Sequence, residues 1–237
     1  MKSGDIIYGR NPVVSSLGNN KVQKIFLLNN FSDRRILSLA KEKKVEIQFV
    51  DLNKMNELTK SGNHQGVCAL VDTFKYSSLE EIIKISKEKK QPLVLILDEI
   101  ADPQNLGAII RSCDAFSVDG IIIKSRNQVQ INMTVVKVST GAIDYVKIAQ
   151  VSNLSNAIKQ LKENGYWIYA ADGSAKDDYD QVVYDRPTAL VVGSEGNGIS
   201  RLVLENSDFI IKIPQTGHVN SLNVSVATGI LLANIRR

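Results

Sequence analysis

Apolar and polar positions follow two different periods along the first third of the chain. Short runs dominated by apolar residues predict strands, and stretches in which apolar residues return every three to four positions predict helices. The predicted strands span 21–28, 45–50 and 66–71, and the predicted helices span 32–44, with Ser32 or Asp33 as N-cap, and 52–62, closed by Gly62. We therefore expect a small α/β domain over residues 1–75.

The charged stretch "SSLEEIIKISKEKKQP" at 77–92 comes next. Its period predicts a helix that ends at Pro92, and its wide polar face favours a position outside a hydrophobic core. We therefore expect a helical linker over 76–91, between the first domain and a second one at 92–237.

Five short, continuous apolar runs lie beyond residue 92. Runs of this kind predict strands that are buried on both faces, as in a parallel sheet covered by helices. They span 93–97, 120–124, 166–172, 188–194 and 208–214, and the crossovers can come from 104–117, 153–164, 199–206 and the terminal stretch. The pattern predicts an α/β fold with an open, mainly parallel sheet.

The net charge of +4 arises entirely in the first third of the chain. Residues 1–77 hold 12 Lys and Arg against 7 Asp and Glu, whereas the remaining 160 residues hold 17 against 18. This positive excess fits a domain that attracts a polyanion such as RNA. A solvated lysine-rich surface explains it equally well, so charge alone leaves both interpretations open.

Composition argues against several classes of protein. Apolar runs stay shorter than the roughly 18–20 residues that a membrane span needs, and the N-terminus lacks the layout of a signal peptide. Cys68 and Cys113, with only two His in the chain and no CxxC motif, argue against a disulfide framework and a zinc site. We expect buried thiols and a cytoplasmic protein without a metal or a membrane contact.

Ligands of open α/β sheets bind beyond the carboxyl ends of the strands, so three loops are candidates. The first, "ADPQNLGAIIRSCDAF" at 101–116, places Asn105 near a helix start and Arg111 further along the helix. Gly107 and Ala108 leave the turn before Arg111 bare, so an arginine and an amide can meet beside free helix N–H groups and bind a phosphate or ribose. A capping Asn and a surface Arg are the simpler explanation.

The second loop, "GSEGNGIS" at 193–200, has glycines that allow a ligand to approach the backbone closely. Its order, G-x-x-G-x-G, differs from the dinucleotide fingerprint and from the Walker A motif. Glu195 would repel phosphates. The loop is either a tight turn with a solvated carboxylate or a site for a ligand without dense negative charge.

The third loop opens the terminal stretch "NSLNVSVATGILLANIRR". Asn220, Ser221, Asn223 and Ser225 precede or begin a helix that is apolar nearly all round. Ordinary helix capping is one interpretation, although it needs only one such residue and four are present.

Three stretches carry a family resemblance when they are taken in order: "DPQNLGAIIRSCDAFSVDGIII", "ALVVGSEGNGISRLVLENSDFIIKIP" and "VNSLNVSVATGILL". Together they resemble the SpoU (TrmH-type) RNA 2′-O-ribose methyltransferases of the SPOUT superfamily. The first third, through "IYGRNPV" and "NHQGV", resembles the RNA substrate-binding domain attached to many of these enzymes. The arrangement is similar to that of bacterial enzymes that modify a guanosine of 23S rRNA, the large-subunit ribosomal RNA.

The resemblance implies a C-terminal trefoil knot that holds S-adenosylmethionine, with S-adenosylhomocysteine as product, no metal, and a homodimer built around the knot. A threaded terminal segment would explain a helix that is apolar all round. The implied catalytic set is Asn105, Arg111, Glu195, Ser221 and Asn223. The implied cofactor-binding set is Gly193, Ser194, Gly196, Ile213, Leu222, Asn223, Thr140 and Gly141.

Two roles are open for Arg111: an unusually perturbed base, or a clamp that stabilises the developing alkoxide, since arginine is a poor base. Glu195 can act by orienting Arg111. Other activities remain as alternatives: a tRNA 2′-O-methyltransferase, an RNA-binding relative without catalysis, and a nucleotide-dependent oxidoreductase, which the glycine order disfavours.

Overall fold

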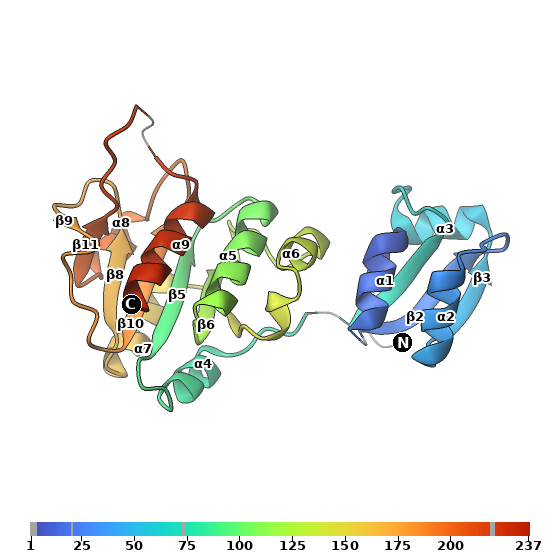
Figure 1. The fold of residues 1–237 in the computed structure, drawn as a ribbon, viewed down its shortest axis with the longest axis horizontal. Coiled ribbons are helices and arrows are strands. Elements are labelled where there is room, and N and C mark those ends of the chain that lie inside the picture. Colours follow the sequence, from blue (N-terminus) through green and yellow to red (C-terminus); the bar gives the residue numbers. More distant parts are fainter. Residues whose placement is uncertain (1–3, 20, 73, 219–220) are drawn as a thin grey trace. The chain divides into compact units, whose positions relative to one another are not determined.

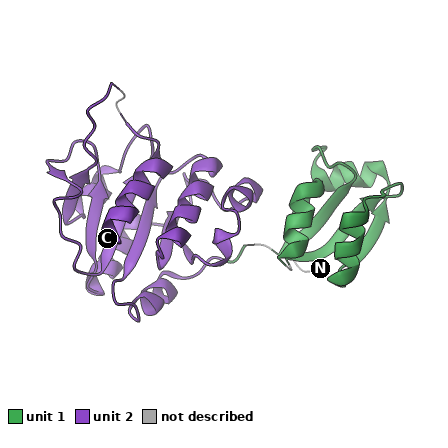
Figure 2. Cartoon of the chain, in the orientation of Figure 1, with its two compact units in different colours: residues 1–75 green, residues 76–237 purple. Residues whose placement is uncertain are grey.

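The computed structural model describes residues 4–19, 21–72, 74–218 and 221–237. The chain divides into two compact units, Met1–Lys75 and Tyr76–Arg237 (Figure 2). Each unit has its own sheet, of four strands in the first and seven in the second.

The first unit is a mixed sheet with three helices (Figure 1). Its elements are β1 (Gly4–Tyr8), α1 (Arg10–Gly18), β2 (Val22–Leu28), α2 (Arg34–Glu42), β3 (Glu46–Val50), α3 (Leu52–Thr59) and β4 (Val67–Asp72). The strand order is β1-β4-β2-β3, with β4 antiparallel to both neighbours and β2 parallel to β3. Asp33 and Asp51 accept the first free N–H groups of α2 and α3, which fixes where these helices begin.

Helix α3 covers one part of this sheet through a small apolar cluster. Val50, Met55 and Cys68 are buried there against Phe26 and Leu58. Burial raises the pKa of the Cys68 thiol to about 11, so this cysteine acts as a small buried hydrophobe. On another part of the unit, α1 packs against α2.

The second unit is built on a seven-stranded parallel sheet. Its strands are β5 (Leu93–Asp98), β6 (Gly120–Lys124), β7 (Ile148–Val151), β8 (Trp167–Ala171), β9 (Asp177–Asp178), β10 (Thr188–Gly193) and β11 (Phe209–Lys212). The order is β7-β6-β5-β10-β8-β11-β9, and every pairing is parallel. All six residues of β5 are buried, as expected for a strand covered on both faces. The predicted α/β fold with a parallel sheet, preceded in the sequence by a smaller α/β unit, is confirmed.

Helices cover both faces of this sheet. They are α4 (Leu79–Ser86), α5 (Pro103–Ala115), α6 (Met133–Val138), α7 (Leu154–Glu163), α8 (Arg201–Glu205) and α9 (Val224–Ile235), with a 3₁₀ turn at Ala142–Asp144. α4, α7 and α8 share one core with β5, β8 and β10. α5 packs between α6 and α9 (Figure 1).

Helix α4 differs from the predicted linker, because it belongs to the second unit. Leu79, Ile82 and Ile83 are buried in the core shared with α7 and the sheet. The wide polar face of the stretch is real, with Glu80, Glu81 and Lys84 exposed, yet one apolar stripe is enough to attach a short helix.

No helix among the described residues is long and apolar enough to cross a membrane. The trefoil knot stays a prediction of the family resemblance.

Candidate functional site

A pocket of about 210 Å³ lies at the carboxyl ends of β8, β10 and β11. Four of the predicted cofactor-binding residues line it, namely Gly193, Ser194, Ile213 and Leu222. Glu195 and Ser221, both predicted as catalytic, line it as well. The structure therefore brings the second and third candidate loops together. Asn220, at the start of the third loop, lies outside the described residues.

The glycine loop after β10 folds back on itself as a tight backbone hairpin. Ser194 N donates to Gly198 O over 3.1 Å, and Gly198 N donates to Ser194 O over 2.9 Å. A Cβ atom at Gly193 would lie 2.1 Å from Gly198 O, so a side chain cannot fit there. Gly198 has a φ of 64°, in the region that favours glycine. Gly196, at the tip, is open: an added Cβ meets no atom within 4 Å.

A polar cluster joins this loop to the starts of two helices. Glu195 Oε1 accepts from Asn223 Nδ2 over 2.7 Å and from Asn105 Nδ2 over 3.1 Å, and Asn223 Nδ2 also lies 2.9 Å from Asn105 Oδ1. Three predicted catalytic residues thus meet at the pocket rim. Asn105 is 90 positions from Glu195 and 118 positions from Asn223 in the sequence. Backbone Val224 N adds a donor to Glu195 Oε1 at 3.3 Å.

The orientation of both amides follows from helix capping. Asn223 is the N-cap of α9, and its Oδ1 accepts from Ser225 N over 2.9 Å, so its Nδ2 must face away from the helix towards Glu195. On α5 the N-cap is Asp102, which accepts from Gln104 N over 2.9 Å, and Pro103 follows it. The simpler explanation of Asn105 as a helix cap is therefore wrong, and its amide is available to the cluster.

Arg111 stands apart from this cluster. Its side chain is exposed on α5 and forms no hydrogen bond or ion pair with another described residue. The hypothesis that Glu195 orients Arg111 is not supported, because no hydrogen bond or ion pair joins these two described side chains. The Arg111 guanidinium is therefore free to bind a ligand.

The face of α5 expected to be bare is partly covered. A Cβ atom at Gly107 would lie 2.6 Å from Val138 Cβ and 3.1 Å from Val135 O, so this glycine serves the packing of α6 on α5. Ala108 is the residue of that turn that stays partly exposed. The expectation of a bare turn was therefore wrong at Gly107.

Two further predicted cofactor residues, Thr140 and Gly141, lie after α6 rather than among the residues that line the pocket. Both have positive φ angles, 50° and 96°, so they form a sharp turn between α6 and the 3₁₀ turn. Gly196 and Asn223 are also absent from the pocket lining, although each is next in sequence to a residue that lines it.

Asp98 is a supporting residue that the sequence analysis missed. It ends β5, is 1% exposed, and accepts from Ser200 N over 2.8 Å, which ties the end of the glycine loop to the sheet. Lys124 Nζ lies 3.6 Å from Asp98 Oδ1 and 2.7 Å from Glu99 Oε1, and the Glu99 hydrogen bond raises the pKa of Lys124. The signal was available, since "LVLILD" places an acid at the carboxyl end of a buried strand.

Asp172 is a second missed residue, and it lines the pocket at the carboxyl end of β8. Its position in "YWIYAAD" carries the same signal as Asp98. Over the described ranges, no group of three or more His, Cys, Asp or Glu side chains could hold a metal ion.

Two known families match this chain, and each matches one of the two units. The SpoU rRNA methylase family matches residues 92–233, and the family described as RNA 2′-O ribose methyltransferase substrate binding matches residues 6–77. Both assignments extend over most of the unit that they describe.

Two bacterial relatives match along almost the whole chain. A protein of Bacillus subtilis assigned to the TrmH family of tRNA/rRNA methyltransferases is 41% identical over 98% of this chain and 95% of its own length. One from Staphylococcus haemolyticus with the same assignment is 41% identical over the same shares.

Solved structures agree on the fold. The SpoU methyltransferase AviRb from Streptomyces viridochromogenes superposes with a TM-score of 0.76 at 20% identity, covering 98% of this chain and 88% of its own. The AdoMet-bound rRNA methyltransferase from Sinorhizobium meliloti gives 0.74 at 24% identity, covering 98% and 87%. The TrmH/SpoU tRNA modifying enzyme of A. aeolicus gives 0.57 at 31% identity, covering 67% and 80%. The chain therefore belongs to the SpoU rRNA methylase family and is an RNA methyltransferase of the TrmH/SpoU type.

Proposed function

We propose that this chain transfers the methyl group of S-adenosylmethionine to a ribose 2′-hydroxyl of RNA, in a guanosine of 23S rRNA. The observation that carries the proposal is the Glu195 cluster, which holds Asn105 and Asn223 at the rim of the carboxyl-end pocket. The family description of residues 6–77 as a 2′-O ribose methyltransferase substrate-binding domain supports the choice of a ribose hydroxyl.

The pocket suits a ligand that carries little negative charge. Its lining includes the carboxylates of Asp172 and Glu195 and the single cation Lys212, among otherwise uncharged residues. Carboxylates near a bound cation are favourable, and a sulfonium is a cation. The tight hairpin at Gly193 lets a ligand approach the backbone, so Gly193, Ser194, Ile213 and Leu222 would hold the cofactor by main-chain contacts.

S-adenosylmethionine, when bound, supplies an electrophilic methyl group on sulfur. Stabilisation of the fold by its product tests this pocket assignment, because a ligand that binds only the native state raises the melting temperature. We expect S-adenosylhomocysteine to raise the melting temperature and NAD to leave it unchanged. Stabilisation by NAD alone would favour a nucleotide-dependent oxidoreductase instead.

Arg111 fits the role of an electrostatic clamp. Arg111 is exposed, and a guanidinium donates hydrogen bonds but has no acceptor for a proton-bearing hydroxyl. Its free guanidinium can bind the phosphate next to the target ribose and stabilise negative charge on the 2′-oxygen. We therefore assign it to substrate positioning and charge stabilisation rather than to proton removal.

The proton of the 2′-hydroxyl needs an acceptor as the new C–O bond forms. Glu195 Oε2 accepts no hydrogen bond from another described residue, while Oε1 holds the two amides. We assign the proton to Glu195 Oε2, from which it passes to solvent. Asn105 and Asn223 keep the carboxylate in place, and Ser221 adds a hydroxyl to the same wall.

Assembly as a homodimer is part of the proposal. α9 buries Val224, Leu231 and Ile235 on its own unit, yet Val226 remains 51% exposed on the same helix. A helix that is apolar beyond its packed face needs a second cover, and a second copy supplies one. The proposal also includes the trefoil knot of the family, a first unit that recruits RNA through its positive charge, and a cytoplasmic location, where ribosomal RNA is found.

The reaction is tested with labelled S-adenosylmethionine and unmodified bacterial rRNA and tRNA as separate substrates. We expect label in 23S rRNA and none in tRNA. The identity to a tRNA modifying enzyme of A. aeolicus makes tRNA the second candidate, and label in tRNA alone would replace 23S rRNA as the target. Label in neither RNA, at protein concentrations that bind S-adenosylhomocysteine, would contradict the proposed activity.

A further inference from the structure

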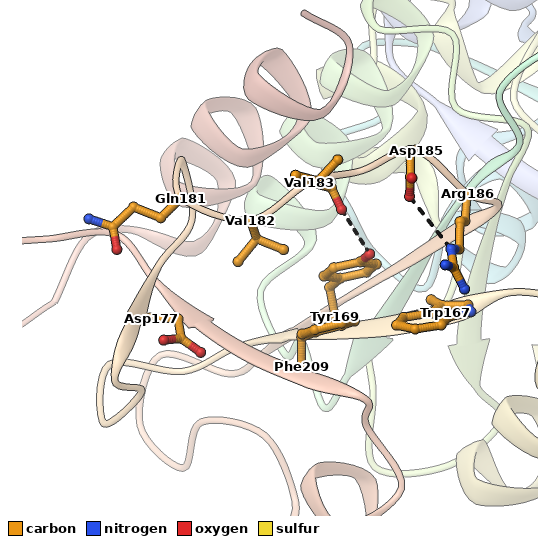
Figure 3. A pocket seen from close by; sticks show the side chains of 9 residues that line it. All are labelled: Trp167, Tyr169, Asp177, Gln181, Val182, Val183, Asp185, Arg186 and Phe209. Atoms are coloured by element: carbon orange, nitrogen blue, oxygen red, sulfur yellow. Dashed lines mark hydrogen bonds and ion pairs between the residues drawn. The ribbon is translucent and has the colours of Figure 1, made fainter.

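A group of aromatic side chains lies at the opposite edge of the same sheet, where β8 and β11 begin. Trp167 and Phe209 stack with ring centroids 5.2 Å apart and planes at 21°, and Tyr169 and Phe209 stack at 4.8 Å and 12°. Trp167 and Tyr169 are two positions apart on β8, so both rings point to one face of the sheet. Tyr169 is 1% exposed and has the Tyr184 ring 4.9 Å away, so it packs beneath an aromatic platform, and the part that a ligand can reach is formed by the partly exposed Trp167 and Phe209 (Figure 3).

The platform is the floor of a pocket of about 460 Å³, which we term the aromatic pocket. Its far wall is the segment 181–186, including Val183, which is 70% exposed, and Tyr169 Oη donates to Val183 O over 3.2 Å. This volume is within the range of about 300–1,000 Å³ typical of small-molecule sites. The aromatic pocket can therefore admit a planar ring.

One contact within the aromatic pocket shows what its rings attract. The guanidinium of Arg186 lies 4.2 Å from the centroid of Trp167, so a planar, delocalised group already rests on the indole face. Arg186 is half-exposed, and besides the indole face its one ion pair among the described residues is with Asp185, 3.6 Å away, so it can move to sandwich an incoming base.

A second pocket, of about 270 Å³, shares Asp185 and Arg186 with the first. Lys87, Lys89 and Lys90 line it, and none of the three forms an ion pair with another described residue. We term it the lysine pocket, and the two together the amino-end groove. Its charged lining is four cations against Asp185, whereas the aromatic pocket has Arg186 against Asp177 and Asp185.

This distribution of charge sorts the parts of a nucleotide. Phosphate is attracted to the lysine pocket and is repelled by the two carboxylates of the aromatic pocket. A base is uncharged, stacks on aromatic rings, and offers N–H groups that carboxylates accept. We propose that the amino-end groove binds an unpaired nucleobase of the RNA substrate in the aromatic pocket and its flanking phosphate in the lysine pocket. The inference rests on the proposed function only in taking RNA as the ligand.

The groove is separate from the carboxyl-end pocket. Trp167 begins β8 and Ala171, which lines the carboxyl-end pocket, ends it, so four residue-to-residue rises, about 13 Å, separate them along the strand. RNA that occupies both must be longer than one nucleotide. The groove is thus a second contact that holds a structured RNA on the catalytic unit.

Trp167 is the only tryptophan of the chain, so its fluorescence reports on this groove alone. We would titrate the full chain with a single-stranded RNA octamer and with a duplex of the same sequence. We expect saturable quenching by the single strand and little by the duplex, whose bases are already stacked. Unchanged fluorescence at concentrations where a labelled octamer is fully bound, or equal quenching by the duplex, would overturn the proposal.

Two variants test the two halves of the groove. Phe209→Leu removes one ring and should weaken the quenching titration roughly 5- to 150-fold. Lys89→Ala/Lys90→Ala should reduce the salt slope of the titration by about 0.7, the value for one lost phosphate contact. The control Arg126→Ala/Lys159→Ala removes two exposed cations that line neither pocket and should leave the titration unchanged. A salt slope that is the same in both double variants would reject the lysine half.

The outcome is distinguishable from failure of the proposed function. Quenching without methyl transfer would leave the groove in place and remove the reaction. Methyl transfer by the wild-type chain without quenching would keep the reaction and remove the groove.

Discussion

The carboxyl ends of β8, β10 and β11 gather amides, carboxylates and bare backbone around a pocket of about 210 Å³. The amino ends of β8 and β11 gather rings around a pocket of about 460 Å³, and cations line the adjoining lysine pocket of about 270 Å³. The first group comes from loops that follow strands, and the second comes from the first residues of strands and the segments before them. The same five-residue strand, β8, contributes to both.

One sheet can thus keep the proposed methyl transfer and the proposed RNA contact at opposite ends of its strands. At the carboxyl edge, helix starts and a glycine hairpin supply fixed donors and acceptors, which suit a site that must position a reacting oxygen. At the amino edge, stacking and charge suit binding of a polyanion without a demand for one geometry. Variants at the two edges should therefore affect different measurements.

The largest effect is expected from Arg111. Arg111→Ala should lower kcat by about a hundredfold to a thousandfold, because a charge that stabilises the developing alkoxide is lost. Arg111→Lys should recover part of the rate, since it keeps the charge and loses the fork. S-adenosylhomocysteine should stabilise both variants as it does the wild type, and quenching of Trp167 should be unchanged. Near-native turnover in Arg111→Ala would remove Arg111 from the mechanism.

The next largest effect is expected at the glycine hairpin. Gly193→Ala should destabilise the second unit by about 3 kcal/mol or more, because the new methyl group would overlap Gly198 O. It should also abolish stabilisation by S-adenosylhomocysteine. Gly196→Ala is the matched control, with open space around the new methyl group, and should unfold like the wild type. Equal melting temperatures for the two variants would mean that the hairpin can move apart to accept a methyl group at residue 193.

Asn223 separates capping from catalysis. Asn223→Ala should cost about 1 kcal/mol of stability, because the N-cap of α9 is lost, and should also lower the rate of methyl transfer. Asn223→Ser should keep most of the stability, yet lose the rate, because a serine can cap but cannot donate to both Glu195 Oε1 and Asn105 Oδ1. Chemical unfolding and initial rates of the two variants measure the two effects. If Asn223→Ser kept the wild-type rate, capping would be the whole role of Asn223.

The smallest effect is expected from salt on the carboxyl-end pocket. The affinity for S-adenosylhomocysteine should change little between low and physiological salt, since that pocket binds no polyanion. Binding of single-stranded RNA at Trp167 should fall with a log–log slope of about −0.7 for each phosphate contact. Calorimetry of the first and fluorescence of the second give the comparison. Equal salt dependence at both edges would contradict the division of charge described above.

Burial decided which strands of the second unit could be predicted from the sequence. The five apolar runs became β5, β6, β8, β10 and β11 with ends shifted by a residue or two, since strands buried on both faces leave a continuous apolar signal. β7 was missed because it is a short edge strand with Gln150 exposed. α1 was missed because it begins after Gly9, contains Pro12 and lacks a clear apolar stripe.

Within the site, residue types were predictable and their partners were not. Glycine order and the acid in the loop singled out Gly193 and Glu195, but only the fold shows that Glu195 binds Asn105 and Asn223 and leaves Arg111 free. Hydrogen bonds between residues far apart in sequence leave no local pattern. The same holds for the Trp167, Tyr169 and Phe209 platform, whose members looked like ordinary strand residues.

The most direct test of the central claim is the chemical position of the transferred methyl group. After reaction with unmodified 23S rRNA, alkaline hydrolysis followed by primer extension would locate any linkage that resists cleavage, since a blocked 2′-oxygen cannot attack the neighbouring phosphate. We expect one resistant linkage, next to a single guanosine, that is absent with Arg111→Ala. A methyl group found on a base, with every linkage still cleaved, would contradict it.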